Sequence, residues 1–211
     1  DCLVGSEMCI RDSFSCGYQL AFITAHFPAL VTEMSAPIDP LGWCGDLGIE
    51  TTAALGGFAI SVIGAANIIG TLMAGWAGKR FGKKWLLSGI YAGRSIAAAW
   101  FILTPITANT VLIFSFAMGF LWLATVPLTS GLVAHIYGIR YMATLYGIVF
   151  FSHQVGSFVG VYLGGVLYDM YGSYTTVWWI GIAVGVFSSL IHLPIREEAR
   201  LSPKSAMFDK A

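Results

Sequence analysis

The feature that most constrains the fold of this chain is a series of six long apolar windows. They cover residues 14–34, 51–75, 85–104, 110–134, 142–168 and 174–194. A helix needs about 20 mostly apolar residues to cross a bilayer, and inside the bilayer every backbone polar group must bond within the protein. Each window therefore predicts a transmembrane helix, and the predicted fold class is an all-α membrane protein. A transmembrane β-barrel would instead show alternating segments of about 10 residues.

Composition supports this class and excludes others. Of the 211 residues, 57% are hydrophobic and 10% are charged, whereas a soluble domain carries about 25% charged residues. The 11 Lys and Arg balance the 11 Asp and Glu, so we expect no nucleic-acid partner. The windows contain no paired nucleophile and base, no paired acids and no metal-ligand spacing. We therefore expect no catalytic residues, no metal and no cofactor, and the protein is not predicted to be an enzyme.

Residues 1–13 (DCLVGSEMCIRDS) differ from the rest of the chain. They are polar, and they resemble the translation of a transposon adapter used in sequencing libraries. The alternative is an ordinary polar terminus. We expect residues 1–13 to be an adapter artefact with no packed contact to the helices, and we expect the sequence to be a truncated fragment whose natural chain begins further upstream.

The basic residues predict the orientation in the membrane, because Lys and Arg in short loops stay on the cytoplasmic side. Nine of the eleven lie in alternate loops and the tail: Lys79, Arg80, Lys83, Lys84, Arg140, Arg196, Arg200, Lys204 and Lys210. The intervening loops, 35–50, 105–109 and 169–173, contain none. This distribution predicts a cytoplasmic C-terminus, with residues 195–211 as a cytoplasmic tail.

The loop between the second and third windows carries the most specific motif, Gly75-Trp76-Ala77-Gly78-Lys79-Arg80-Phe81-Gly82-Lys83-Lys84. Gly75 and Gly78 predict the end of a helix, because glycine tolerates the left-handed cap conformation, and Gly82 predicts a tight reversal. The pattern resembles the loop signature of the major facilitator superfamily. Lys79 departs from it, standing where that family usually has Asp. The resemblance implies a conformational loop motif, of the degenerate kind found between helices 8 and 9, made of Gly75, Lys79, Arg80, Gly82, Lys83 and Lys84.

Three further stretches are similar to bacterial monocarboxylate-transporter-like members of that superfamily. Residues 16–29 look like their helix 7, residues 121–131 like helix 10, and residues 152–160 like helix 11. The resemblance covers nearly all of residues 14–198. It implies a twelve-helix transporter in a bacterial inner membrane, of which residues 14–194 are helices 7–12 and the N-terminal six-helix half is missing.

Polar residues inside spans are candidates for the substrate site, because they are costly in hydrocarbon. Arg94 lies about 15 Å deep, and its partner is expected to be a backbone carbonyl, a substrate anion or an acid of the missing half. Gln19 and His26 share a face of the first window, and His153 and Gln154 lie near mid-depth in the fifth. The resemblance places these two helices beside the transport cavity. Each of the four either meets solute or bonds to another helix. Asn67 in the second window and Tyr146 in the fifth are weaker candidates.

Glycines and prolines predict how the helices pack. Gly156, Gly160 and Gly164 repeat every four residues, so they share one face of the fifth window and allow a close helix contact. That contact is either static packing or a sliding surface. Their small size also predicts open volume beside His153. Pro28 and Pro127 lie inside windows and predict kinks.

The resemblance implies a secondary active transporter that works by alternating access. The expected substrate is a small organic anion, most specifically a monocarboxylate, and the expected coupling ion is a proton, which a histidine exchanges near neutral pH. The other expected partners are the lipid bilayer and the missing half. The alternative is a membrane sensor or scaffold without transport. A membrane-embedded enzyme ranks last.

Overall fold

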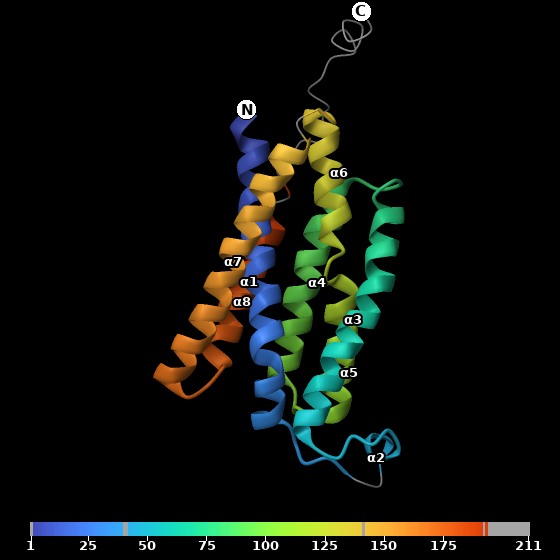
Figure 1. The fold of residues 1–211 in the computed structure, drawn as a ribbon, viewed down its shortest axis with the longest axis vertical. Coiled ribbons are helices and arrows are strands. Elements are labelled where there is room, and N and C mark those ends of the chain that lie inside the picture. The colour runs from blue at the N-terminus through green and yellow to red at the C-terminus, as the bar shows by residue number, and fades with distance from the viewer. Residues whose placement is uncertain (1, 40–41, 141, 192, 194–211) are drawn as a thin grey trace, which may run out of the picture.

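The computed structural model describes residues 2–39, 42–140, 142–191 and 193 (Figure 1). Its helices are α1 (Cys2–Met34), α2 (Trp43–Asp46), α3 (Thr52–Ala77), α4 (Lys83–Leu103), α5 (Ala108–Leu121), α6 (Thr125–Tyr137), α7 (Met142–Tyr171) and α8 (Thr175–Ile191). The described part of the chain is therefore helical throughout, which confirms the predicted class. The short α2 was not predicted. The tail, 195–211, lies outside the described residues.

Four helical segments are long and apolar enough to cross a membrane: Thr52–Ala77, Lys83–Leu103, Ala108–Ala134 and Met142–Tyr171. Thr175–Leu190 is apolar but shorter. The first window, within α1, is less apolar, because Gln19 and His26 interrupt it. Membrane-spanning helices are thus confirmed, while the count of six stays a prediction.

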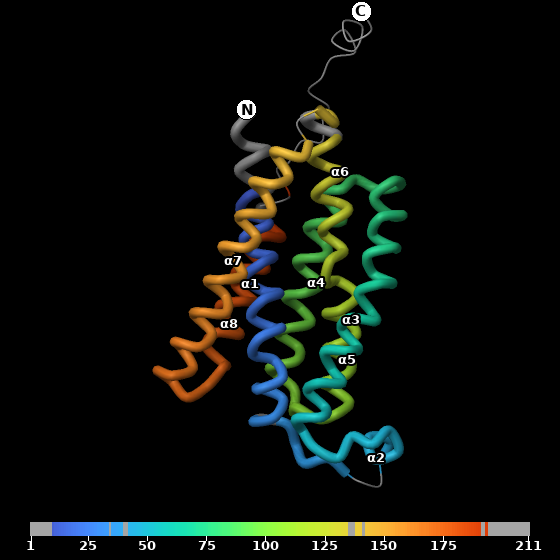
Figure 2. The backbone as a smooth tube through the Cα atoms, in the orientation of Figure 1, coloured from blue at the N-terminus to red at the C-terminus, as the bar shows by residue number. Residues whose placement is uncertain are grey.

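The helices run up and down in one bundle (Figures 1 and 2). The main packed pairs are α1 with α7, α3 with α5, and α4 with α8. The connections at 78–82 and 138–140 lie at one end of the bundle, and those at 35–39, 42–51, 104–107 and 172–174 lie at the other. The described basic loops therefore share one end, as the charge distribution requires.

An aromatic cluster fills the centre of four helices near the 35–51 end. Phe27 of α1, Phe101 of α4 and Phe114 of α5 are fully buried, with Trp178 of α8 among them. The rings of Phe101 and Phe114 stack with centroids 4.5 Å apart. The Trp178 indole also donates a hydrogen bond of 2.9 Å to the Ala98 carbonyl. This cluster fixes one end of the bundle, and the polar groups described below lie further toward the other end.

The predicted fourth span, 110–134, is two helices and not one. Residues 122–124 separate α5 from α6, and Pro127 lies in the first turn of α6. Proline has no N–H to give to a preceding carbonyl and its ring crowds the preceding turn, so the kink predicted at Pro127 becomes a break just before it.

The glycine signals around the 78–82 loop were partly wrong. The end of α3 falls at Ala77, but Gly78 has φ −63° and Gly82 has φ −58°, so neither is left-handed. Gly75 remains inside α3. Among the described residues the glycines with positive φ are Gly48, Gly138 and Gly172, all in connections between helices.

The expectation that residues 1–13 make no packed contact was wrong at the end of that segment. Helix α1 continues through it from Cys2. Ile10 packs against a core cluster of α4, α6 and α7 residues, and Asp12 is buried. The Ser152 hydroxyl donates to the Ile10 carbonyl over 2.7 Å. An uninterrupted helix continues the α1 face that already packs on α7. The side chains of Leu3 and Val4 lie outside the described residues.

The glycines of α7 lie against α1, as predicted. A Cβ built on Gly156 would overlap the Phe14 carbonyl oxygen, one on Gly160 the Tyr18 carbonyl oxygen, and one on Gly164 the His26 ring. Gly17 of α1 faces α7 in the same way. The backbones of α1 and α7 therefore touch, and the open volume expected beside Gly156 and Gly160 is filled by α1.

Candidate functional site

A small cavity of about 50 Å³ lies between α1, α4, α6 and α7. It is lined by side chains from all four helices: Ser13, Cys16, Tyr91, Leu123, Thr125, Val126, Thr129, Tyr146, Val149, Phe150 and His153. Hydroxyl groups, one thiol and one imidazole supply its polar surface. The cavity can therefore both donate and accept hydrogen bonds.

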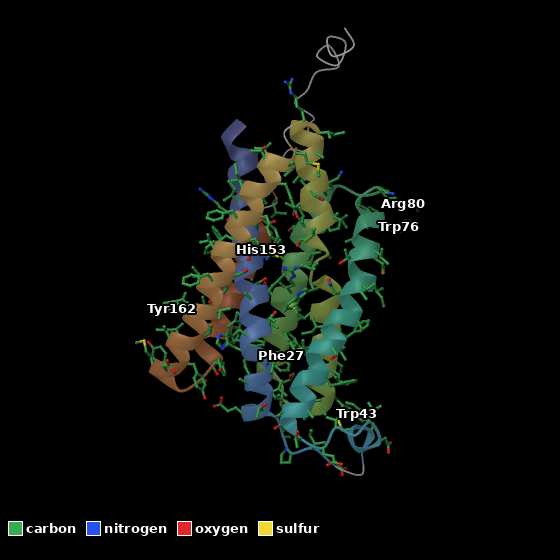
Figure 3. The ribbon with its side chains drawn as sticks, in the orientation of Figure 1. Phe27, Trp43, Trp76, Arg80, His153 and Tyr162 are labelled. Carbon is green, nitrogen blue, oxygen red and sulfur yellow. The ribbon has the colours of Figure 1, made fainter. Side chains whose placement is uncertain are left out.

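His153 is the predicted site residue that lines this cavity, together with the weaker candidate Tyr146. Figure 3 shows His153 in the middle part of α7. The ring interacts with the Cys16 side chain and with the backbone of Ser13, both on α1, and it stacks on Phe150 with centroids 5.6 Å apart. It is half-buried. The imidazole is thus oriented by α1 and α7 together, and the cavity lies beside α6 and not beside the α7 glycines.

Arg94 does not reach the cavity surface, because it is 0% exposed. Its Nε donates to the Leu121 carbonyl over 3.0 Å, and its Nη2 donates to the Leu121 carbonyl over 2.6 Å and to that of Trp122. Its Nη1 donates to Cys16 Sγ over 3.4 Å. Of the three partners expected from the sequence, backbone carbonyls are the ones observed. Arg94 therefore contacts the broken helix, and its role in substrate binding stays a prediction.

Asn67 of α3 also contacts the broken helix. Its Oδ1 accepts a hydrogen bond of 3.0 Å from the Leu123 backbone N–H and one of 3.2 Å from the Thr71 hydroxyl. Leu123 lies between α5 and α6, where a helix would otherwise have used this N–H. Asn67 therefore replaces a missing helical hydrogen bond and does not line the cavity.

Gln19 and His26 bond to other helices. Gln19 is 5% exposed, and its Nε2 donates to the Gly181 carbonyl of α8 over 2.8 Å. His26 Nε2 lies 3.0 Å from the Val161 carbonyl of α7, which requires the ring nitrogen to donate. Of the two possibilities, a contact to solute or a hydrogen bond to another helix, the structure contains the hydrogen bond for both residues.

Gln154 lies on the exposed side of α7 and outside the cavity. Its neighbour His153 faces a different side of the helix, because adjacent helical residues are about 100° apart. The inward orientation expected for Gln154 is therefore not observed within this bundle.

Most of the residues that line the cavity lie outside the predicted site. Cys16 also lines the cavity, and the Cys16 Sγ lies 3.6 Å from the Thr125 hydroxyl. Thr125 and Thr129 lie in the apolar window 110–134, where a threonine does not stand out as a site residue. The available signal was Pro127, since a broken helix turns the residues beside the break toward a cavity more often than a continuous one does.

The loop motif packs against α6. A Cβ built on Gly78 would lie 2.6 Å from Leu128 Cδ2, and one built on Gly131 would lie 3.3 Å from Lys83 Cε. Lys79 and Gly82 are exposed. The Arg80 guanidinium lies 4.5 Å from the Trp76 ring centroid, and the Lys84 ammonium lies 5.3 Å from that of Trp85.

Comparison with known families decides the class of protein. The family described as Major Facilitator Superfamily matches residues 14–209, which is most of the chain. The chain belongs to the Major Facilitator Superfamily. The relatives that follow are named as transporters and not as enzymes, in agreement with the membrane-spanning helices of this chain.

Three relatives agree with this family. An uncharacterized MFS-type transporter, YcxA, of Bacillus subtilis (strain 168) is 26% identical over 85% of this chain and 41% of its own length. A triacylglyceride transporter of Mycobacteroides abscessus is 23% identical over 67% of this chain and 26% of its own. The monocarboxylate transporter 12-B of Danio rerio is 28% identical over 64% and 29%. The chain therefore spans less than half the length of these relatives.

Proposed function

We propose that this chain is the C-terminal six-helix half of a twelve-helix major facilitator transporter that moves a small organic anion, most specifically a monocarboxylate, together with a proton. In this proposal α1, α3, α4, α5–α6, α7 and α8 are helices 7–12, and the C-terminus is cytoplasmic. Two six-helix halves would rock around a site near the midplane, as in alternating access. The membrane would be a bacterial inner membrane.

The cavity beside His153 is the observation that carries the proposal. It lies between helices and offers His153, Tyr146 and Thr129 to a solute. Arg94, whose side chain bonds Cys16 at the cavity wall, adds a buried positive charge. A donor-rich cavity near a cation favours a carboxylate over a neutral or cationic solute. The monocarboxylate class is supported further by the partial likeness to the Danio rerio protein.

His153 is the group proposed to exchange the coupling proton. Histidine is the side chain that ordinarily titrates near neutral pH. His153 contacts Cys16 and Ser13 on α1 while it lies on α7, so a change in its charge acts on both helices. Proton exchange and the packing of the cavity wall would then be linked.

The test uses the full-length transporter in proteoliposomes and measures uptake of lactate and pyruvate. His153→Ala should lower the affinity by roughly 5- to 150-fold, the value of one good polar contact, with normal insertion. His153→Gln keeps a hydrogen-bonding group, so it should retain solute exchange at fixed pH but lose the dependence of uptake on a pH gradient. Thr144→Ala, at an exposed position of the same helix, is the control and should leave both unchanged.

Two results would contradict the proposal. Unchanged uptake of every organic anion in inserted His153→Ala would remove the site from this cavity. Wild-type protein that inserts normally but transports no organic anion would instead support the sensor or scaffold alternative.

A further inference from the structure

The break between α5 and α6 leaves backbone groups without their helical partners, and two side chains from other helices replace those partners. Arg94 of α4 donates to the carbonyls of Leu121 and Trp122. Asn67 of α3 accepts from the N–H of Leu123. An unpaired backbone group in a membrane interior costs several kcal/mol. The hydrogen bonds to these two carbonyls and this N–H avoid that cost.

The same network reaches the cavity wall. Arg94 Nη1 donates to Cys16 Sγ over 3.4 Å, and Cys16 Sγ lies 3.6 Å from the Thr125 hydroxyl on the first turn of α6. Arg94 is fully buried and its guanidinium is occupied by these contacts. A direct contact between Arg94 and a solute is therefore incompatible with this arrangement.

One turn further along α6, Thr129 has different surroundings. It is 6% exposed and lines the cavity. Within the described part of the chain its hydroxyl has no hydrogen-bond partner, whereas Thr125 is bonded to Cys16. A hydroxyl that lines a cavity and has no protein partner is available to a ligand, to which it can donate a hydrogen bond.

We propose that Thr129 contacts the transported solute, and that Arg94 and Asn67 are positioning residues that hold the α5–α6 break so that Thr129 faces the cavity. This inference rests on the proposed function in one respect: the solute is an organic anion whose carboxylate accepts a hydrogen bond from the Thr129 hydroxyl. The positioning role concerns the backbone of residues 121–125 and holds for any solute of this cavity.

The contact is tested with Thr129→Val, which keeps the side-chain volume and removes the hydroxyl. In the full-length transporter the KM for lactate or pyruvate should rise about 10-fold or more, the value of a hydrogen bond to a charged group, with little change in the maximal rate. Thr144→Val, on the exposed side of α7, is the matched control and should keep the wild-type KM.

The positioning role is tested by hydrogen exchange of the backbone amides in residues 121–126, measured by mass spectrometry on the same proteins. Asn67→Leu leaves the Leu123 N–H without an acceptor, so exchange there should accelerate about tenfold, and the KM should rise as well. Asn67→Asp keeps an acceptor oxygen and should restore both values. Arg94→Lys cannot reproduce the planar fork to two carbonyls and a thiol, so it should behave like Asn67→Leu. Thr129→Val should leave the exchange unchanged.

Each part can fail separately. A wild-type KM in Thr129→Val refutes the contact, and unchanged exchange in both Asn67→Leu and Arg94→Lys refutes the positioning role. If Asn67→Leu does not insert, the smaller change Asn67→Ala takes its place with the same expected result. Wild-type protein that transports no organic anion refutes the proposed function, and the exchange measurement then still decides the positioning role.

Discussion

Replacement of Gly160 by alanine should loosen the contact between α1 and α7. A Cβ at this position would lie 3.0 Å from Tyr18 Cα and 3.1 Å from Tyr18 C, and closer still to the Tyr18 carbonyl oxygen. Carbon atoms in contact are normally about 3.5–4.0 Å apart. The obstacle is backbone and not a flexible side chain, so the two helices must separate by about 1 Å.

The expected cost follows from that separation. A gap of about 0.5–1 Å removes a quarter to a half of the dispersion energy of each contact that it opens. The contact between α1 and α7 extends from Gly17 of α1, against His153, to Gly164 of α7, against His26. The loss of dispersion energy is therefore shared along the whole interface. Overpacking of this kind costs about 1–3 kcal/mol. We expect Gly160→Ala to lower the stability of the protein by that amount.

The matched control is Gly165→Ala on the same helix. A Cβ on Gly165 meets nothing within 4 Å, and alanine is favoured over glycine in a helix by up to about 1 kcal/mol. Gly165→Ala should therefore be as stable as the wild type or more so. Unfolding in detergent, followed by circular dichroism, measures both variants. Equal stability of Gly160→Ala and Gly165→Ala would refute the close backbone contact.

Two further predictions concern the ends of the bundle. The first uses intact cells that express the full-length protein and an impermeant thiol reagent. The reagent should label Asp46→Cys and not Lys79→Cys, because the basic loops are expected to stay in the cytoplasm. Labelling of Lys79→Cys and not of Asp46→Cys would overturn the proposed orientation. Burial raises the pKa of the Cys44 thiol above its ordinary value, so less thiolate is present at a given pH. Alkylation of Cys44 should therefore need a higher pH than alkylation of Asp46→Cys, which is exposed on the same helix. Coincident pH profiles of the two alkylation rates would contradict this.

The helices were largely predictable from the sequence, because apolar length is a direct requirement of the membrane. The second window, 51–75, became Thr52–Ala77, and the third, 85–104, became Lys83–Leu103. The break at residues 122–124 was predictable only as a kink at Pro127. Whether a proline bends or interrupts a helix depends on the partners available to its freed backbone groups, and those partners, Arg94 and Asn67, come from other helices.

The site was less predictable. The sequence shows which polar side chains lie at mid-depth, but each of them can meet its hydrogen bonds on a solute, on a side chain or on a neighbouring backbone. Gln19 and His26 bond to carbonyls of α8 and α7, and only the fold supplies that information. His153 was found because it is ionisable, while Thr129 was missed because a threonine within an apolar window carries no such signal.

Two helix contacts hold the parts of this bundle together. The α1–α7 contact packs glycines against backbone, and hydrogen bonds from Ser152 to the Ile10 carbonyl and from His26 to the Val161 carbonyl also join these two helices. The α5–α6 break is held by directional hydrogen bonds to Arg94 and Asn67, whose loss would leave buried groups unpaired. A rocking motion should therefore keep α6 fixed to α3 and α4. If the proposed function holds, Thr129 and His153 then approach or leave the solute together, because the half moves as one body.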